Sequence, residues 1–154
     1  MDAAELLDQY HKGTRTFPKV KLAGAQLAGA NLSDIDLRAG FLLRANLRDA
    51  SLVGANLLEI NLSRATLERA NLQDANLFAA NLFHARLDQA NLEGANLEGA
   101  NLEGANLTGA RLTNARLDRA NLRNALLTEQ QLASTASLYQ AILPDGTKFN
   151  ETSA

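Results

Sequence analysis

Leucine recurs at every fifth position along most of this chain. The pattern runs from Leu22 to Leu127 without interruption, 22 leucines in all. Alanine stands two residues before the leucine in 18 of these 22 cases, and asparagine often directly precedes it, so the repeat reads A-N-L-x-x. The other two positions vary and are mostly polar. The regularity predicts one small structural unit, used again and again along the chain.

A five-residue period fits neither an α-helix nor a flat β-strand. On a helix each step of five would rotate the leucine by a net ~140°, so no single face could bury all the leucines. In a strand, side chains alternate, so successive leucines would face opposite sides. Both conflicts disappear if the chain turns once in each repeat, with alanine and leucine pointing inward. The sequence therefore predicts an all-β solenoid wound around its own leucines.

These units resemble the repeats of the pentapeptide repeat family. The resemblance is carried by the units from Asn71–Ala75 through Asn121–Ala125, and it extends over residues 20–127. Members of that family form a right-handed, four-sided β-helix with four repeats per coil. The resemblance thus implies a right-handed quadrilateral β-helix of about 5.5–6.5 coils, similar to short members of the family from cyanobacteria.

The sequence holds its own indication of a 20-residue coil. Three of the four positions at which alanine is replaced are Val20, Gly40 and Ile60, which lie 20 residues apart. In a coil of four repeats they would stack in one column. A minimal Gly40 between two bulky neighbours would then balance the local volume of the core.

The N-terminal part of the chain predicts a cap on a single domain of residues 1–154. Over residues 2–13, Asp2 and Glu5 match a capping box and the apolar residues share one face. We expect a short helix that covers the exposed edge of the first coil. Phe17 is in phase with the leucines, so the repeats are predicted over residues 17–127.

The C-terminal part predicts a second cap over residues 128–149. Thr128 and Gln131 match another capping box, which indicates one or two helical turns. The inward pairs then resume one residue out of phase, because Leu138 follows Leu132 by six positions. Residues 150–154 are polar, and they are predicted to be a disordered tail.

Composition narrows the classes of function. The 15 basic and 17 acidic residues leave a net charge of −2, which argues against wrapping of nucleic acid. The chain has no cysteine, which excludes disulfides and thiolate chemistry. No apolar run reaches the ~18 residues of a membrane span, and the first residues lack the features of a signal peptide. We expect a cytoplasmic protein that contacts neither nucleic acid nor membrane directly.

No pattern in the sequence points to catalysis or to a metal. His11 and His84 are its only histidines, and neither has a second ligand at a metal-site spacing. Gly94 and Gly99 have the glycine spacing of a phosphate-binding loop, but no Lys-Ser/Thr pair follows them. We therefore expect no catalytic residue, no metal and no cofactor.

The polar outward positions predict structural roles. Asparagines 20 residues apart, such as Asn81 and Asn101, are expected to stack and to hydrogen bond along the rod. Four carboxylates occupy the same outward position in successive repeats: Asp88, Glu93, Glu98 and Glu103. Five nearby arginines are expected to compensate this acidic belt: Arg86, Arg111, Arg116, Arg119 and Arg123.

Large apolar residues at outward positions make the candidate interaction patch: Phe41, Leu43, Leu58, Phe78 and Phe83. Steps of 20 place Leu58 and Phe78 in one column. They place Leu43 and Phe83 in another column on the adjacent side, near Phe41. A continuous apolar patch would predict a protein contact, whereas scattered single hydrophobes are common and harmless. The sequence leaves both interpretations open.

These observations favour a non-enzymatic protein–protein interaction module whose exact role is unknown. A rod filled by leucine offers no concavity in which polar groups could converge on a substrate. The expected partner is another protein, and a homodimer is left open. The family resemblance implies an alternative, because one branch mimics duplex DNA and inhibits or protects DNA gyrase. The near-balanced charge and the lack of an evident inserted loop depart from that branch.

Overall fold

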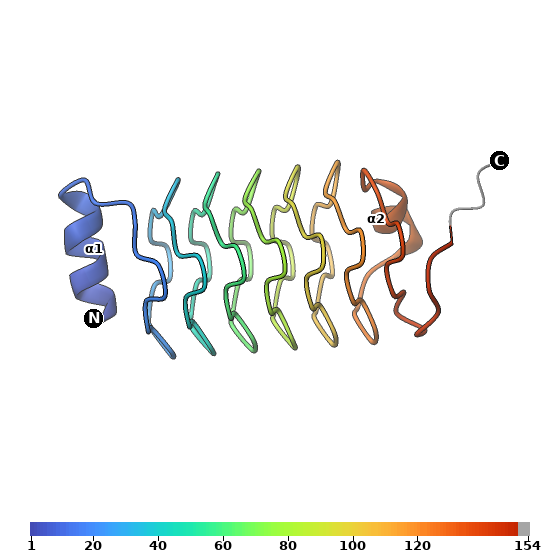
Figure 1. The fold of residues 1–154 in the computed structure, drawn as a ribbon, viewed down its shortest axis with the longest axis horizontal. Helices are drawn as coiled ribbons and strands as arrows, with labels where there is room; N and C mark the ends of the chain where they lie inside the picture. Colours follow the sequence, from blue (N-terminus) through green and yellow to red (C-terminus); the bar gives the residue numbers. More distant parts are fainter. Residues whose placement is uncertain (151–154) are drawn as a thin grey trace.

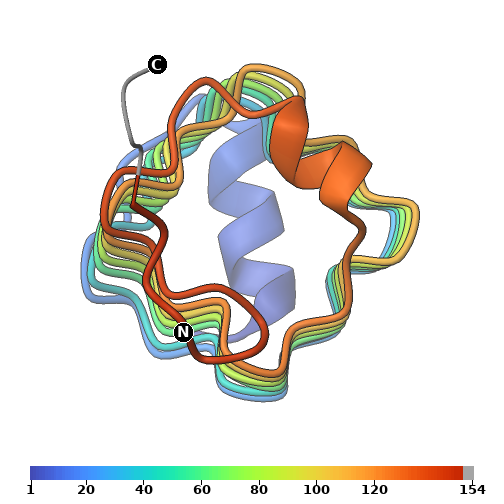
Figure 2. The same ribbon diagram turned by 90° about the vertical axis from the view of Figure 1, so that its right-hand side faces the viewer.

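The computed structural model describes residues 1–150. The chain forms a rod of stacked coils, with helix α1 (Ala3–His11) across one end and helix α2 (Glu129–Ala133) near the other (Figure 1). Viewed along the rod, successive coils overlie one another closely (Figure 2). Of the predicted disordered tail, residues 151–154 lie outside the described part of the chain.

Parallel backbone bridges join residues that are 20 positions apart. They start at Thr16–Asp36 and recur at every fifth residue as far as Asn106–Leu126. Hydrogen bonds run in both directions between neighbouring coils: the Leu92 amide donates to a carbonyl of the following coil, and the Asn91 amide to one of the preceding coil, over 2.8 Å and 2.9 Å. A coil therefore holds four repeats, and the fold is of the β-helix type with strands reduced to single bridges.

Each repeat turns directly after its leucine. The amide three residues later donates to the leucine carbonyl, as Ala95 does to Leu92 over 3.0 Å. The second residue after the leucine adopts left-handed backbone, with φ between 53° and 70° throughout the repeats. The asparagine before the leucine closes the turn: Asn91 Oδ1 accepts from the Glu93 amide over 3.0 Å. Asparagine is suited to this role because its short side chain hydrogen bonds readily to nearby backbone.

The predicted asparagine ladder is wrong for most of the rod. Within residues 1–150, one hydrogen bond joins the side chains of stacked asparagines, from Asn121 Nδ2 to Asn101 Oδ1 over 3.4 Å. Elsewhere the Oδ1 atom accepts from the backbone amide two residues on, as in Asn71 and Asn96. The prediction failed because a side-chain bond closed within one turn competes with a bond to the next coil.

Left-handed backbone at non-glycine residues offers a direct test of the turn. Ala79 and Gly99 stack in one column with φ of 55° and 69°. A Cβ atom at Gly99 would lie 4.0 Å from the Ala79 Cα, which is ordinary contact. Ala79→Gly is therefore expected to raise the free energy of unfolding, and Gly99→Ala to lower it, each by roughly 0.5–1 kcal/mol. Denaturant unfolding measures both; a change of the same sign in the two variants would contradict the turn assignment.

The interior is filled by the leucine and alanine columns. Every repeat leucine from Leu22 to Leu122 is at most 3% exposed, and the alanines from Ala45 to Ala125 are buried beside them. At Gly40 an added Cβ would lie 2.8 Å from the Leu37 carbonyl oxygen and 3.5 Å from Val20 Cγ1. The close approach to the Leu37 carbonyl favours glycine at this position, whereas Val20 is at ordinary contact distance, so the volume argument for the column stays a prediction.

Helix α1 lies across the N-terminal end of the leucine core. It begins after Asp2, whose side chain forms a capping box with Glu5. Leu6 and Tyr10, one helical turn apart, are buried against the first coil. The Tyr10 hydroxyl donates to the Ser33 carbonyl over 2.9 Å. Apolar contact and one polar bond together hold the helix in place.

The C-terminal end is built differently. Thr128 and Gln131 form the capping box of α2. Beyond α2 the bridges join residues 21 apart, Arg116–Ser137 and Asn121–Ile142, which confirms the predicted one-residue shift. An antiparallel bridge between Ile142 and Lys148 then folds the chain back on itself. This returning segment covers part of the last coil.

Candidate functional site

Three residues of the candidate interaction patch are exposed and two are half-buried. Phe41 is 48% exposed, and Leu43 and Phe78 are each 38% exposed. Leu58 and Phe83 are partly covered. Since the Glu59 amide bonds the Phe78 carbonyl in the next coil, Leu58 and Phe78 stand in neighbouring coils of one column. Phe41 and Leu43 flank the same repeat leucine.

The Phe83 ring contacts two neighbouring side chains, His84 and Arg64. Its ring meets the His84 ring edge-on, with centroids 4.3 Å apart. The Arg64 guanidinium lies over the Phe83 ring, 5.6 Å from its centroid. Contacts of this kind stabilise a cation beside an aromatic face. Because Arg64 and His84 pack against it, Phe83 offers less exposed apolar area to a partner than Phe41 or Phe78 does.

A basic column runs beside the apolar residues. The Arg44 amide bonds the Ser63 carbonyl and the Arg64 amide bonds the Phe83 carbonyl, so Arg44, Arg64 and His84 occupy one corner of three successive coils. Neither arginine forms an ion pair within residues 1–150. Their positive charge is therefore available to a partner, beside exposed apolar side chains.

Asp88, Glu93 and Glu98 of the acidic belt each have an arginine partner, as predicted, but Glu103 has none within residues 1–150. Arg111 bonds Glu93 at 2.6 Å, and Arg116 bonds Glu98 at 3.0 Å. Glu98 also receives Arg119, at 2.9 Å. In the described part of the chain Arg123 forms no such pair, contrary to the expectation. The belt is a set of partly exposed ion pairs, which contribute little individually to stability.

A buried carboxylate was missed by the sequence analysis. Glu68 is 6% exposed, and it lies between Arg86, with which it pairs closely, and Arg48 at 3.5 Å. A signal did exist in the sequence. Acid and arginine at a spacing of 18 residues recur in Glu93–Arg111 and Glu98–Arg116, and Glu68–Arg86 has the same spacing.

One exposed ion pair perturbs the titration of its members. Arg69 donates to both carboxylate oxygens of Asp49, over 2.8 Å and 3.0 Å. These hydrogen bonds lower the pKa of Asp49 and raise that of Arg69. The two residues lie 20 apart, so the pair clamps neighbouring coils at a corner. It is a structural contact rather than a reactive one.

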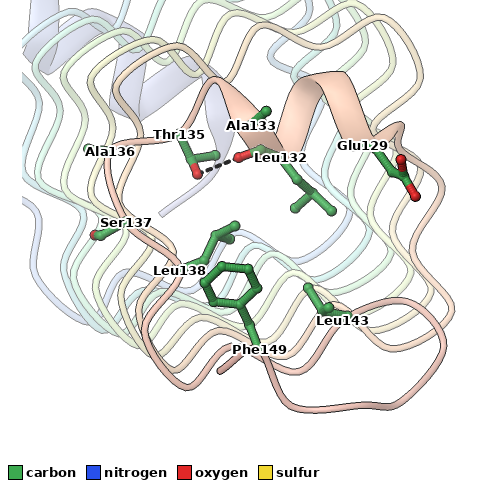
Figure 3. Close-up of a pocket in the computed structure, with 9 residues that line it drawn as sticks. All are labelled: Glu129, Leu132, Ala133, Thr135, Ala136, Ser137, Leu138, Leu143 and Phe149. Carbon is green, nitrogen blue, oxygen red and sulfur yellow. Dashed lines mark hydrogen bonds between the residues drawn. The ribbon is translucent and has the colours of Figure 1, made fainter. Parts of the chain in front are cut away.

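A cavity of about 460 Å³ opens at the C-terminal end of the rod, between α2 and the returning segment (Figure 3). Four large apolar side chains face it: Leu132, Leu138, Leu143 and Phe149. Glu129 is the charged residue at its margin. No pattern in the sequence indicated this cavity, since residues 128–149 were expected only to form a cap on this end of the rod.

The described residues contain neither a cluster of metal ligands nor a membrane-spanning helix. Over residues 1–150, no three metal-ligating side chains gather in one place. His84 lies over Gly104 of the next coil, where a Cβ would come within 2.5 Å of the imidazole. Neither helix within this range has the length and apolar character of a membrane span.

The chain resembles several proteins of known structure. Rfr23 from the cyanobacterium Cyanothece 51142 is 32% identical, over 82% of this chain and 92% of that one, with a TM-score of 0.45. The alr5209 protein from Nostoc PCC 7120 is 30% identical, over 87% and 93%, with a TM-score of 0.48. QnrB1, a plasmid-mediated fluoroquinolone resistance protein, is 17% identical over 83% and 81%, with a TM-score of 0.38. Among curated proteins none matches the chain significantly.

The stacked coils and uniform core define a repeat protein of the β-helix type. The sequence matches the family model described as pentapeptide repeats in 8 copies, over residues 45–82, 75–114 and 85–124. These segments together cover more than half of the chain. The chain belongs to the pentapeptide repeat family, and cyanobacterial proteins are among its relatives.

Proposed function

We propose that this protein is a non-enzymatic interaction module, which presents one side of a rigid rod to another protein. In this proposal the rod is a right-handed, four-sided β-helix of about 5.5–6.5 coils, closed at the N-terminal end by α1. The uniform leucine core and the backbone bonds between all neighbouring coils support the rigidity. A rigid surface loses little conformational freedom on binding, which favours recognition.

The observation that carries this function is the exposure of Phe41, Leu43 and Phe78 on a rod whose other outward positions are mostly polar. Beside them stand Arg44 and Arg64, which no carboxylate in the described residues neutralises. Apolar anchors near unpaired cations suit a protein partner that combines apolar and acidic side chains. We propose such a surface as the partner.

The proposal is tested with the double variant Phe41→Glu, Phe78→Glu. It is expected to lose partner capture from the source cell, with affinity lowered by about tenfold or more. Its free energy of unfolding should stay within about 0.5 kcal/mol of the parent, because both side chains are exposed. Affinity purification followed by binding measurement with the captured partner checks the first result, and denaturant unfolding the second.

A matched control is Thr108→Glu, because Thr108 is exposed and occupies the same position of its repeat as Phe78. This variant should capture the partner as the parent does. An unchanged capture profile in the double variant would contradict the proposed surface. Loss of self-association in sedimentation, with no other partner captured, would assign the surface to a homodimer instead.

The alternative function is inhibition or protection of DNA gyrase, which rests on the family resemblance and on the similarity to QnrB1, a fluoroquinolone resistance protein. The net charge of −2 gives it little support, because a mimic of duplex DNA needs dense negative charge. A supercoiling assay discriminates between the two functions. Inhibition, or relief of fluoroquinolone poisoning, would favour the alternative over the interaction module.

A further inference from the structure

The two ends of the leucine core are covered to different extents. At the N-terminal end Leu6 and Tyr10 of α1 close over the first coil, and Leu22 above them is buried. At the C-terminal end Leu132, which keeps the phase of the repeats, and Leu138, which is shifted by one residue, are only partly buried. Figure 2 looks onto this end, where α2 and the returning segment lie at the margins of the last coil. The cavity of about 460 Å³ opens between them (Figure 3).

The wall of this cavity is mainly apolar, and its two hydroxyl groups already donate hydrogen bonds within the protein. Thr135 donates its hydroxyl to the Leu132 carbonyl over 2.7 Å, and Ser137 donates to Asp118 over 2.7 Å. The Glu129 carboxylate at the margin forms no ion pair within the described residues. An occupant should therefore bring apolar side chains for the wall and a cation for Glu129.

We propose that the cavity binds a short amphipathic helix of a partner protein. Two large apolar side chains, four residues apart, enter the cavity, and a Lys or Arg on the adjacent face meets Glu129. Helix α1 is the precedent for such a contact, because it covers the opposite end of the same core with Leu6 and Tyr10 at that spacing. Helices that dock through residues one turn apart commonly fill hydrophobic grooves, and the volume lies within the range of ligand cavities.

In this proposal the occupant belongs to another protein, and the test below distinguishes it from a second copy of the chain. The site is separate from the surface of Phe41 and Phe78, so it does not depend on the function proposed above.

The test uses a fluorescein-labelled peptide of residues 2–13 that carries Glu5→Lys and Asp8→Lys, which keeps Leu6 and Tyr10 on one face and makes the polar face basic. Fluorescence anisotropy with the full chain is expected to show saturable binding. The matched peptide with Leu6→Ser and Tyr10→Ser should bind at least about tenfold more weakly. In the protein, Leu138→Glu should weaken binding by a similar factor.

Further variants separate this proposal from the others. Glu129→Lys changes an exposed side chain, so the fold is expected to persist. It should lower the affinity for the basic peptide by about threefold or more. Phe78→Glu should leave peptide affinity unchanged. No saturation, or equal binding of the two peptides, would overturn the proposal. A concentration-dependent dimer that Leu138→Glu dissolves and the peptide does not displace would also overturn it, since a second copy of the chain would then be the occupant.

Discussion

Leu72→Ala is expected to lower the free energy of unfolding by about 2–5 kcal/mol. Leu72 is fully buried in the middle of the rod, with a repeat leucine of the adjacent coil on either side. Stacked coils bonded along their whole length leave little room for the surrounding leucines to collapse. The truncated side chain therefore leaves a cavity in addition to the lost apolar burial. Denaturant unfolding followed by circular dichroism measures the effect.

The matched comparison is Glu93→Ala, which lies next to Leu92, one coil further along the same side of the rod. Glu93 is partly exposed, and its ion pair with Arg111 is open to solvent. Its removal should cost no more than about 1 kcal/mol. Equal losses in Leu72→Ala and Glu93→Ala would contradict the inward assignment of leucine, and with it the whole account of the repeat.

Leu6→Asp is expected to detach α1 from the first coil. The protein should then aggregate as its concentration rises. Leu6 is fully buried between α1 and the first coil, and a carboxylate there would have no partner. Detachment would expose Phe17 and the unpaired backbone of the first coil. An open β-edge beside an apolar core is a template for aggregation. Size-exclusion chromatography with light scattering at rising concentration checks the expected growth in mass.

Leu7→Asp is the control for this experiment, because Leu7 is only partly buried on the same helix. It should perturb association much less than Leu6→Asp does. A Leu6→Asp protein that stays monodisperse, with an unchanged helical contribution to its circular dichroism, would show that α1 does not protect the edge.

The course of the backbone could be predicted from the sequence because one physical constraint determines it. A five-residue leucine period forces a turn in each repeat, and Val20, Gly40 and Ile60 mark a coil of 20 residues. The one-residue shift before Leu138 likewise shows directly in the spacing, and the bridges move from 20 to 21 residues there. Each of these features depends on the size and spacing of side chains, which can be read directly from the sequence.

The predictions that failed concern side chains with more than one available partner. Asparagine could bond to the next coil or to its own turn, and composition does not decide between them; the local bond is the one formed. Glu68 was missed because its burial depends on Arg48 and Arg86 in neighbouring coils. The C-terminal cavity was missed for a similar reason. The volume of this cavity depends on the distance between α2 and Phe149, and no pattern in the sequence indicates that distance.

The candidate interaction patch was predictable in part. Steps of 20 residues place Phe78 and Leu58 in neighbouring coils, as the structure has them. The exposure of each side chain was not predictable, because Arg64 and His84 pack against Phe83 while Phe41 remains open. The basic column of Arg44 and Arg64 becomes recognisable only once the ion pairs of the other arginines are known.

The central claim is that 20 residues of chain advance the rod by a single coil. Spin labels attached at Lys19→Cys and Arg119→Cys, on a chain that has no native cysteine, measure this by pulsed dipolar spectroscopy, with Lys19→Cys and Ala79→Cys as the shorter pair. These pairs span five coils and three coils, so the two distances should differ by only about 10 Å, at ~4.8 Å per coil. A difference near ~60 Å, as for 40 residues of α-helix, or distances without a defined maximum, would contradict the account.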